Sequence, residues 1–167
     1  YGRKKEIGTN IEGIAISGGR LYVGLRSPNI NGDAFIVSAP VKDLFAAGSQ
    51  GLKNELVSTI NVRLGANTGI RDLAALKDGR LLILSGPTVS QLDIGFKIWL
   101  LGKPAMGAQL RLLTELTTQT VTENGEIAKA ETIVVIDEKD TSFSVLVLYD
   151  NIDEGRPILH SIVFRSQ

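Results

Sequence analysis

The apolar residues of this chain fall in short runs separated by Gly, Asn, Asp and Pro, which is the pattern of β-strands joined by turns. Residues 14–17 give way to Gly18-Gly19, a pair that supplies the positive φ angles of a tight hairpin, and residues 21–26 then return antiparallel. Short strands continue to the end of the chain, with one short helical excursion at residues 40–47. The pattern therefore predicts an all-β fold.

Two later stretches repeat the pattern of residues 11–28. The second begins at Ile70 and keeps an acid, an apolar strand, a turn, an Arg-Leu start and a closing Pro, and a third begins near Ala130. The acidic residues Glu12, Asp72 and Glu131 stand 60 and 59 residues apart, so each unit opens with a carboxylate at nearly the same phase. A period of this length is typical of repeat architectures.

The inner strands of these units distinguish between all-β architectures. Residues 81–84 and 145–149 are apolar on both faces, whereas a sandwich strand with one wet face alternates. In a β-propeller, neighbouring four-stranded blades cover both faces of such strands. We therefore expect a β-propeller or propeller fragment of about three four-stranded blades, the last of them incomplete, with a β-sandwich as the main alternative. The expected blades are residues 11–65, 70–118 and 128–167.

These units are too few to close a propeller, which needs at least about four blades. Either residues 1–167 form a single propeller-like unit that is the C-terminal part of a longer protein, or several copies of the chain assemble into a ring. The third unit lacks the strand that a ring-closing design would take from the other terminus, which favours the first interpretation. The expected partner is thus the rest of the propeller, with another copy of the chain as the alternative.

The composition of the chain argues against nucleic-acid and membrane partners. The 167 residues carry 18 basic and 18 acidic side chains, so no net charge attracts nucleic acid or an anionic membrane. No apolar run has the length that a bilayer crossing requires. The chain has no Cys, which excludes disulfides and thiolate catalysis but leaves the compartment open, because many exported proteins also lack Cys. We expect neither nucleic-acid nor membrane partners.

Four short motifs carry a resemblance to a known family. They are Ile-Glu-Gly-Ile-Ala at 11–15, Gly-Leu-Arg-Ser-Pro at 24–28, Ile-Arg-Asp-Leu at 70–73 and Leu-Ile-Leu-Ser-Gly-Pro at 82–87. In order and spacing the chain resembles the bacterial family called domain of unknown function 3616. The resemblance implies a longer propeller-like protein with no assigned activity. The third unit departs from the pattern, because Glu131 is followed by Thr132 instead of Gly.

A more distant likeness is to the esterase-like phytase group, whose blades also open with Glu-Gly. Here the likeness rests on Glu12 and Gly13. It implies calcium-dependent phosphate chemistry.

Hairpin geometry predicts where the charged residues meet. The first two strands of each unit run antiparallel, so Glu12 should lie beside Arg26, and Asp72 beside residues 85–87. The first strand of a propeller blade is the innermost, so these residues should approach one mouth of the central channel. The candidate ligand-binding residues are Glu12, Arg26, Arg71, Asp72 and Glu131, with Lys129 and Asp150 nearby.

Two interpretations of this charged group stay open. Carboxylates that converge from several blades suit a hard cation such as Ca²⁺, which would bind Glu12, Asp72 and Glu131, and clustered arginines suit a small anionic ligand. In the structural interpretation, each acid pairs with an arginine or binds a loop amide of the adjacent blade, and the charges only hold the sheets together.

The leading functional hypothesis is a binding or interaction module with a mixed-charge site for a small anionic ligand or a protein partner. The alternatives are a calcium-dependent phosphoesterase or esterase-like hydrolase, and a purely structural interaction domain. Nucleophilic catalysis has little support, since Ser17 lacks the Gly-x-Ser-x-Gly elbow. His160 lies in an apolar run that favours a hydrogen-bonded structural histidine. No catalytic residue is assigned.

Overall fold

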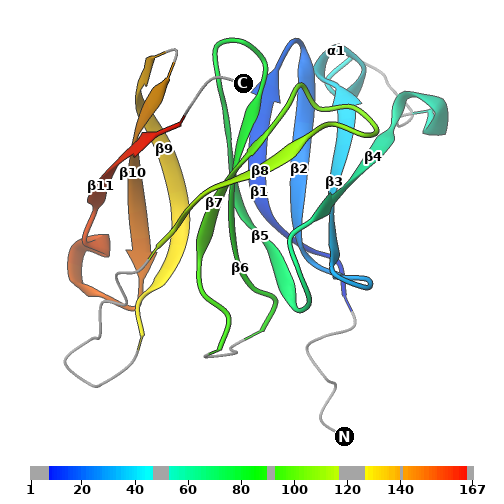
Figure 1. The fold of residues 1–167 in the computed structure, drawn as a ribbon. Helices are drawn as coiled ribbons and strands as arrows, with labels where there is room; N and C mark the ends of the chain where they lie inside the picture. Colours follow the sequence, from blue (N-terminus) through cyan, green and yellow to red (C-terminus); the bar gives the residue numbers. More distant parts are fainter. Residues whose placement is uncertain (1–7, 47–52, 90–92, 117–126, 140, 165–167) are drawn as a thin grey trace, which may run out of the picture.

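The computed structural model describes residues 8–46, 53–89, 93–116, 127–139 and 141–164, which form three antiparallel β-sheets in chain order (Figure 1). The all-β prediction is confirmed. The short helix α1 (Val41–Leu44) lies within the predicted helical excursion. In the part of the chain that is described, no helix combines the length and apolarity needed to cross a membrane.

The first sheet has the strand order β1-β2-β3-β4. Its strands are β1 (Asn10–Ser17), β2 (Arg20–Ser27), β3 (Asp33–Pro40) and β4 (Ser58–Arg63), and the 3-10 helix η1 (Asn54–Leu56) precedes β4. Gly18 and Gly19 have φ angles of 55° and 74° at the β1–β2 turn. Two positive φ angles in succession match the twist of a tight hairpin, so this pair of glycines connects β1 to β2 as predicted.

The second sheet has the same topology, in the order β5-β6-β7-β8. Its strands are β5 (Thr68–Ala75), β6 (Leu81–Pro87), β7 (Lys97–Leu101) and β8 (Leu110–Glu115). All seven residues of β6 are buried, including the four consecutive apolar residues that begin the strand. Both faces of this strand are therefore covered, as the continuous apolar run indicates.

The third sheet has the order β11-β10-β9. Its strands are β9 (Lys129–Lys139), β10 (Ser142–Asp150) and β11 (Ile158–Val163), and the 3-10 helix η2 (Asp153–Gly155) lies between the last two. Within the described residues this sheet has three strands, against four in each of the other sheets.

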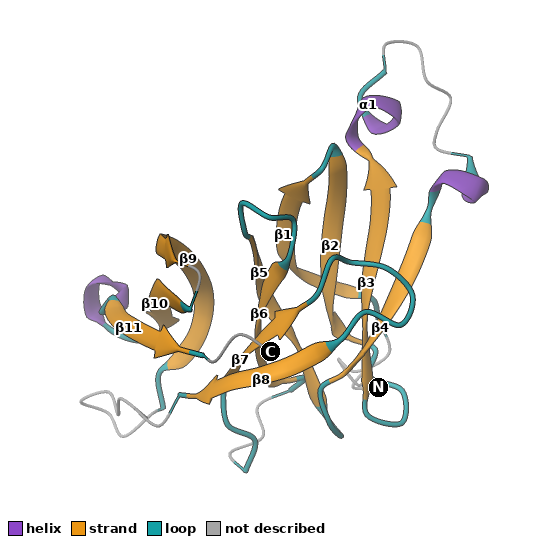
Figure 2. Ribbon diagram, turned by 45° about the horizontal axis from the view of Figure 1, so that its top comes forward, coloured by secondary structure: helices purple, strands orange, loops and turns teal. Residues whose placement is uncertain are grey.

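Two hydrophobic clusters lie on opposite sides of the middle sheet, which Figures 1 and 2 show between the other two. The first cluster joins the first and second sheets and includes Tyr22, Ile36, Ile70, Leu73 and Ile83. The second joins the second and third sheets and includes Leu82, Leu84, Phe143, Val145 and Val147. Three sheets that stack in series in this way differ from the expected alternative of a two-sheet sandwich.

Successive sheets pack in the same manner. Strand β5 contacts β1 and β2, and β9 contacts β5 and β6, so the first strand of each later sheet lies against the first two strands of the preceding sheet. The approach is close: a Cβ atom on Gly69 would lie 2.0 Å from the carbonyl oxygen of Arg26, and one on Gly24 would lie 2.5 Å from Cγ2 of Ile70. Glycine at these positions lets the backbones of two sheets approach each other.

Candidate functional site

A β-bulge interrupts the first strand of each sheet at an equivalent place. The pairing of β1 with β2 skips Glu12, the pairing of β5 with β6 skips Arg71, and the pairing of β9 with β10 skips Glu131. A second irregularity in the β1–β2 pairing skips Arg26. A bulge adds one unpaired residue and redirects its side chain, so four charged side chains leave the regular alternation of their strands.

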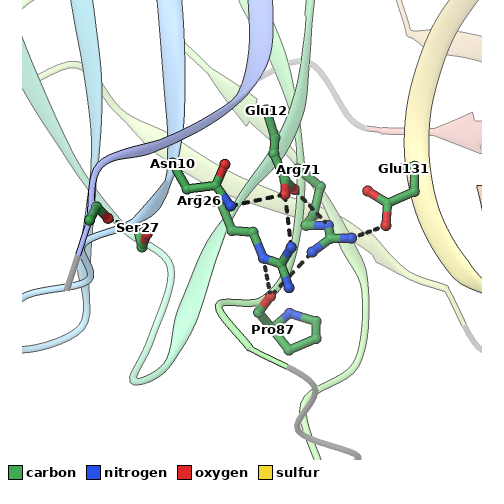
Figure 3. A network of polar contacts seen from close by, with 8 residues as sticks. Asn10, Glu12, Arg26, Ser27, Arg71, Pro87 and Glu131 are labelled. Carbon is green, nitrogen blue, oxygen red and sulfur yellow. Dashed lines mark hydrogen bonds and ion pairs between the residues drawn. The ribbon is translucent and has the colours of Figure 1, made fainter. Parts of the chain in front are cut away.

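The guanidinium group of Arg71 lies between two carboxylates (Figure 3). Its Nη2 donates a hydrogen bond to Oε1 of Glu131, and its Nε forms an ion pair of 3.2 Å with Oε2 of Glu12 that lacks hydrogen-bond geometry. Its Nη1 donates to the carbonyl oxygen of Pro87 at 3.5 Å. Because Glu12, Arg71 and Glu131 come from three different sheets, this one side chain connects all of them.

Arg26 extends the network towards solvent. Its Nη1 donates to Oε1 of Glu12 at 2.8 Å, and its Nε donates to the carbonyl oxygen of Pro87 at 3.2 Å. Asn10 Nδ2 donates to the same Glu12 oxygen at 3.3 Å. The side chain of Arg26 is 19% exposed, whereas that of Arg71 is 1% exposed. Two arginines and two glutamates balance in charge, with Arg71 beneath and Arg26 reachable from solvent.

Burial dominates the electrostatics of this network. It lowers the pKa of Arg71, although Glu131 and Glu12 act in the opposite direction. Burial likewise raises the pKa of Glu131, although the Arg71 charge opposes the rise. Both shifts disfavour the charged forms, so desolvation outweighs the attraction within the pair. An arginine guanidinium stays protonated despite such a shift, and each of the two charged groups therefore depends on its partner.

The structure places Asp72 outside the network, although the repeat spacing predicts it there. Its Oδ1 accepts a hydrogen bond from the backbone N–H of Leu73 at 2.8 Å, and its Oδ2 accepts one from the backbone N–H of Ile133 in β9 at 2.9 Å. Burial raises the pKa of Asp72, although both hydrogen bonds favour the carboxylate. Asp72 thus joins the second sheet to the third through the backbone, as the structural interpretation expects of an acid.

The three carboxylates proposed for Ca²⁺ do not form one group. Glu12 and Glu131 both contact Arg71, and Asp72 binds two backbone amides. Throughout the described ranges, no three His, Cys, Asp or Glu side chains gather in a group that could hold a metal ion. Of the five predicted site residues, the structure brings together Glu12, Arg26, Arg71 and Glu131.

The remaining charged and titratable candidates lie in the third sheet. Asp150 of β10 lies opposite Lys129 of β9 in the strand register, next to the bulge at Glu131. His160 lies in β11, and its Nε2 is buried without a hydrogen-bond partner among the described residues, so the expected hydrogen bond is not observed at that atom. Burial lowers the pKa of His160. A histidine with a lowered pKa is neutral near pH 7, which suits a packing role in this strand.

Two features of the site depend on the backbone and have little or no signal in the residue types. The carbonyl oxygen of Pro87 accepts hydrogen bonds from both Arg26 and Arg71, and any residue could supply such an oxygen. The bulges are the second feature. The only trace of them in the sequence is the charged residue that interrupts an apolar strand start, as Glu12 does between Ile11 and Gly13.

A family model described as Protein of unknown function (DUF3616) matches residues 3–165. No curated protein and no solved structure matches the chain. These comparisons do not show the expected likeness to the esterase-like phytase group.

Proposed function

The chain belongs to the DUF3616 family of proteins of unknown function, and we propose that its three sheets are adjacent blades of a β-propeller that acts as a binding module. Its site is the mixed-charge mouth formed by Glu12, Arg26, Arg71 and Glu131. The observation that carries the proposal is the contact among the three bulged residues, one from the first strand of each sheet, with Glu12 and Glu131 on the guanidinium group of Arg71.

The packing of the sheets supports the propeller arrangement. Propeller blades are four-stranded sheets arranged around a central channel. Here the strands β1, β5 and β9 contact one another in series, as the innermost strands of neighbouring blades would. The two complete sheets have four strands each in sequential order. On this arrangement, the four charged residues face one mouth of the channel.

The state of the charges favours binding over catalysis. Each charged group of the network is held by an opposite charge, and Asp72 is held by two backbone amides. A hydrolytic centre needs a base, a nucleophile or a metal ion that is free to act on substrate. An anionic ligand needs only a reachable cation with N–H donors, and Arg26 combines partial exposure with a guanidinium group. Arg26 is therefore the residue that a small anion would contact.

Thermal unfolding with inorganic phosphate or citrate tests this proposal. A ligand at about 100 times its dissociation constant adds roughly 2.7 kcal/mol to stability, which raises Tm by about 5 to 10 °C in a chain of this size. We expect the rise in wild type and in the control Arg63→Gln, whose exposed side chain pairs with Asp33. We expect no rise in Arg26→Gln. The absence of a shift with both anions in wild type would overturn the anion site.

The same series with Ca²⁺ and with a chelator separates the hydrolase alternative. A calcium-dependent hydrolase requires a rise in Tm with Ca²⁺ and turnover of a phosphate or carboxylate ester that the chelator abolishes. Because the carboxylates contact arginine or backbone amides, we expect neither effect. Calcium-dependent turnover that is lost in Glu131→Gln would instead support the hydrolase.

A further inference from the structure

Equivalent positions in the three sheets differ sharply in exposure. In β5, the residues one place before and two places after the bulged Arg71 are Ile70 and Leu73, which are 0% and 3% exposed. They pack in the cluster between the second sheet and the first. In β9, the corresponding residues Ala130 and Ile133 are again 0% and 3% exposed, in the cluster between the third sheet and the second. These positions are thus where a sheet packs against the sheet that precedes it.

The first sheet has the same positions filled with large apolar residues that no other part of the described chain covers. The counterparts in β1 are Ile11 and Ile14, one place before and two after the bulged Glu12, and they are 54% and 59% exposed. Ile16, two residues further on the same face, is also exposed. The first sheet therefore presents the face with which its two successors contact a preceding sheet.

The third sheet presents the complementary face. Val134 of β9, Leu146 of β10 and Leu159 of β11 are paired across the three strands and form one apolar row. Val134 and Leu159 are exposed and Leu146 is half-buried. On the second sheet, the face that points the same way along the series carries Leu82 and Leu84, which are buried against the third sheet. Among the described residues, no sheet covers this face of the third sheet, and none covers the opposite face of the first.

We propose that a second copy of this chain covers these faces, in place of the further sheets of a longer chain that the sequence favours, so that β1 of one copy packs against β9 and β10 of the other. This repeats the contact that β5 makes with β1 and β2, and that β9 makes with β5 and β6, so the new interface continues an existing one. Two copies with three sheets each supply six sheets, within the range of about four to eight blades that closed propellers use. The result is a head-to-tail ring of two chains.

The like charges at the mouth oppose this assembly only in part. Glu12 and Glu131 would approach each other across the new interface, but each is already paired with an arginine of its own copy. The apolar faces then decide the association, since burial of such surface is the main favourable contribution to it. The proposal rests on the propeller arrangement above and is independent of the anion site at Arg26, so the thermal-shift series and the mass measurement can fail separately.

The mass of the chain in solution tests the proposal. We expect light scattering to give twice the chain mass of 17.9 kDa for wild type. Ile14→Asp on the first sheet and Leu159→Asp on the third should each reduce the mass to that of one chain. Met106→Asp places the same charge on a fully exposed residue of the β7–β8 loop and should leave the dimer intact. Should Ile14→Asp fail to fold by circular dichroism, Ile16→Asp tests the same face.

A mixing experiment distinguishes head-to-tail association from a symmetric contact between identical faces. Ile14→Asp retains an intact third sheet and Leu159→Asp retains an intact first sheet, so an equimolar mixture of the two monomers can form one wild-type interface. We expect the mixture to recover a mass of two chains. A monomeric wild type overturns the proposal and indicates that sheets outside this chain cover the faces. A dimer that survives both variants, or a mixture that stays monomeric, overturns it as well.

Discussion

The substitution Glu131→Gln tests whether the charge network stabilises the packing of the three sheets. It removes one negative charge from Arg71 and keeps the size of the side chain. Arg71 is 1% exposed and would keep one charged partner, Glu12, together with the carbonyl oxygen of Pro87. Removal of one partner from a fully buried ion pair costs about 3 to 5 kcal/mol, because the other charge is left uncompensated in a medium of low dielectric constant.

The expected loss is smaller than this limit for three reasons. Burial raises the pKa of Glu131, so a neutral side chain recovers part of the desolvation cost of the carboxylate. The side chain of Glu131 is 30% exposed, so solvent screens part of the interaction. The amide oxygen of Gln can also still accept a hydrogen bond from Arg71. A hydrogen bond to a charged group contributes about 1.5 to 3 kcal/mol, and the Gln variant keeps such a bond. Subtracting this contribution from the limit, we expect Glu131→Gln to lower the free energy of unfolding by about 2 kcal/mol. In a chain of this length, that corresponds to a fall in Tm of about 4 to 8 °C.

Urea unfolding and thermal unfolding at pH 7 measure this effect, with Glu115→Gln as the matched control. Glu115 pairs with Lys97 at 2.7 Å, but its side chain is largely exposed. An exposed pair contributes about 0 to 1 kcal/mol, so the control should lie close to wild type. Equal losses for Glu131→Gln and Glu115→Gln would refute the reasoning, since burial of Arg71 would then make no difference. With Arg71→Met as the partner variant, a double-mutant cycle should give a coupling energy of at least about 1 kcal/mol.

Two further predictions concern contacts between adjacent sheets. Burial raises the folded-state pKa of Asp72 above its unfolded value, so the stability it contributes is full below about pH 4 and is lost as pH rises through the folded pKa. Wild type should therefore lose stability relative to Asp72→Asn as pH rises above about 4 in urea unfolding. A difference in unfolding free energy between the two proteins that does not change with pH would contradict this. Gly69→Ala places a Cβ 2.0 Å from the carbonyl oxygen of Arg26 and should lower the free energy of unfolding by at least about 1 to 3 kcal/mol. The control Gly95→Ala, with no atom within 4 Å of its Cβ, should be within about 0.5 kcal/mol of wild type. Equal effects of the two variants would exclude a close approach of the sheets at Gly69.

The strands could be predicted from the sequence because their signals are local. Apolar runs and turn residues are read over a few positions, and Gly18-Gly19 and Asp78-Gly79 mark their hairpins without reference to any other part of the chain. The stacking of the sheets follows from one non-local argument. Residues 81–84 are apolar on both faces and so require a cover on each, which the first and third sheets supply.

The charged site could be predicted only in part, because strand pairing decides which residues meet. The spacing of acids selects Asp72, but the bulge in β5 falls one residue earlier. A shift of one residue in a strand sends the side chain to the other face, and Arg71 therefore occupies the place equivalent to Glu12 and Glu131. The pattern of apolar residues does not show where a strand bulges. The spacing of the acidic residues therefore does not reveal that Arg71 stands in β5 at the place equivalent to Glu12 and Glu131.

This exchange explains how three sheets with nearly the same inner strand can share one network. Three carboxylates at equivalent places would repel one another, or would require a cation to hold them. With arginine in the middle sheet, Glu12 and Glu131 each find an opposite charge in the adjacent sheet, and Arg26 balances the remaining negative charge. Asp72, displaced to the opposite face of β5, holds the third sheet through the N–H of Ile133. The alternation of acid, base and acid therefore supplies within the chain the positive charge that a metal ion would otherwise have to provide.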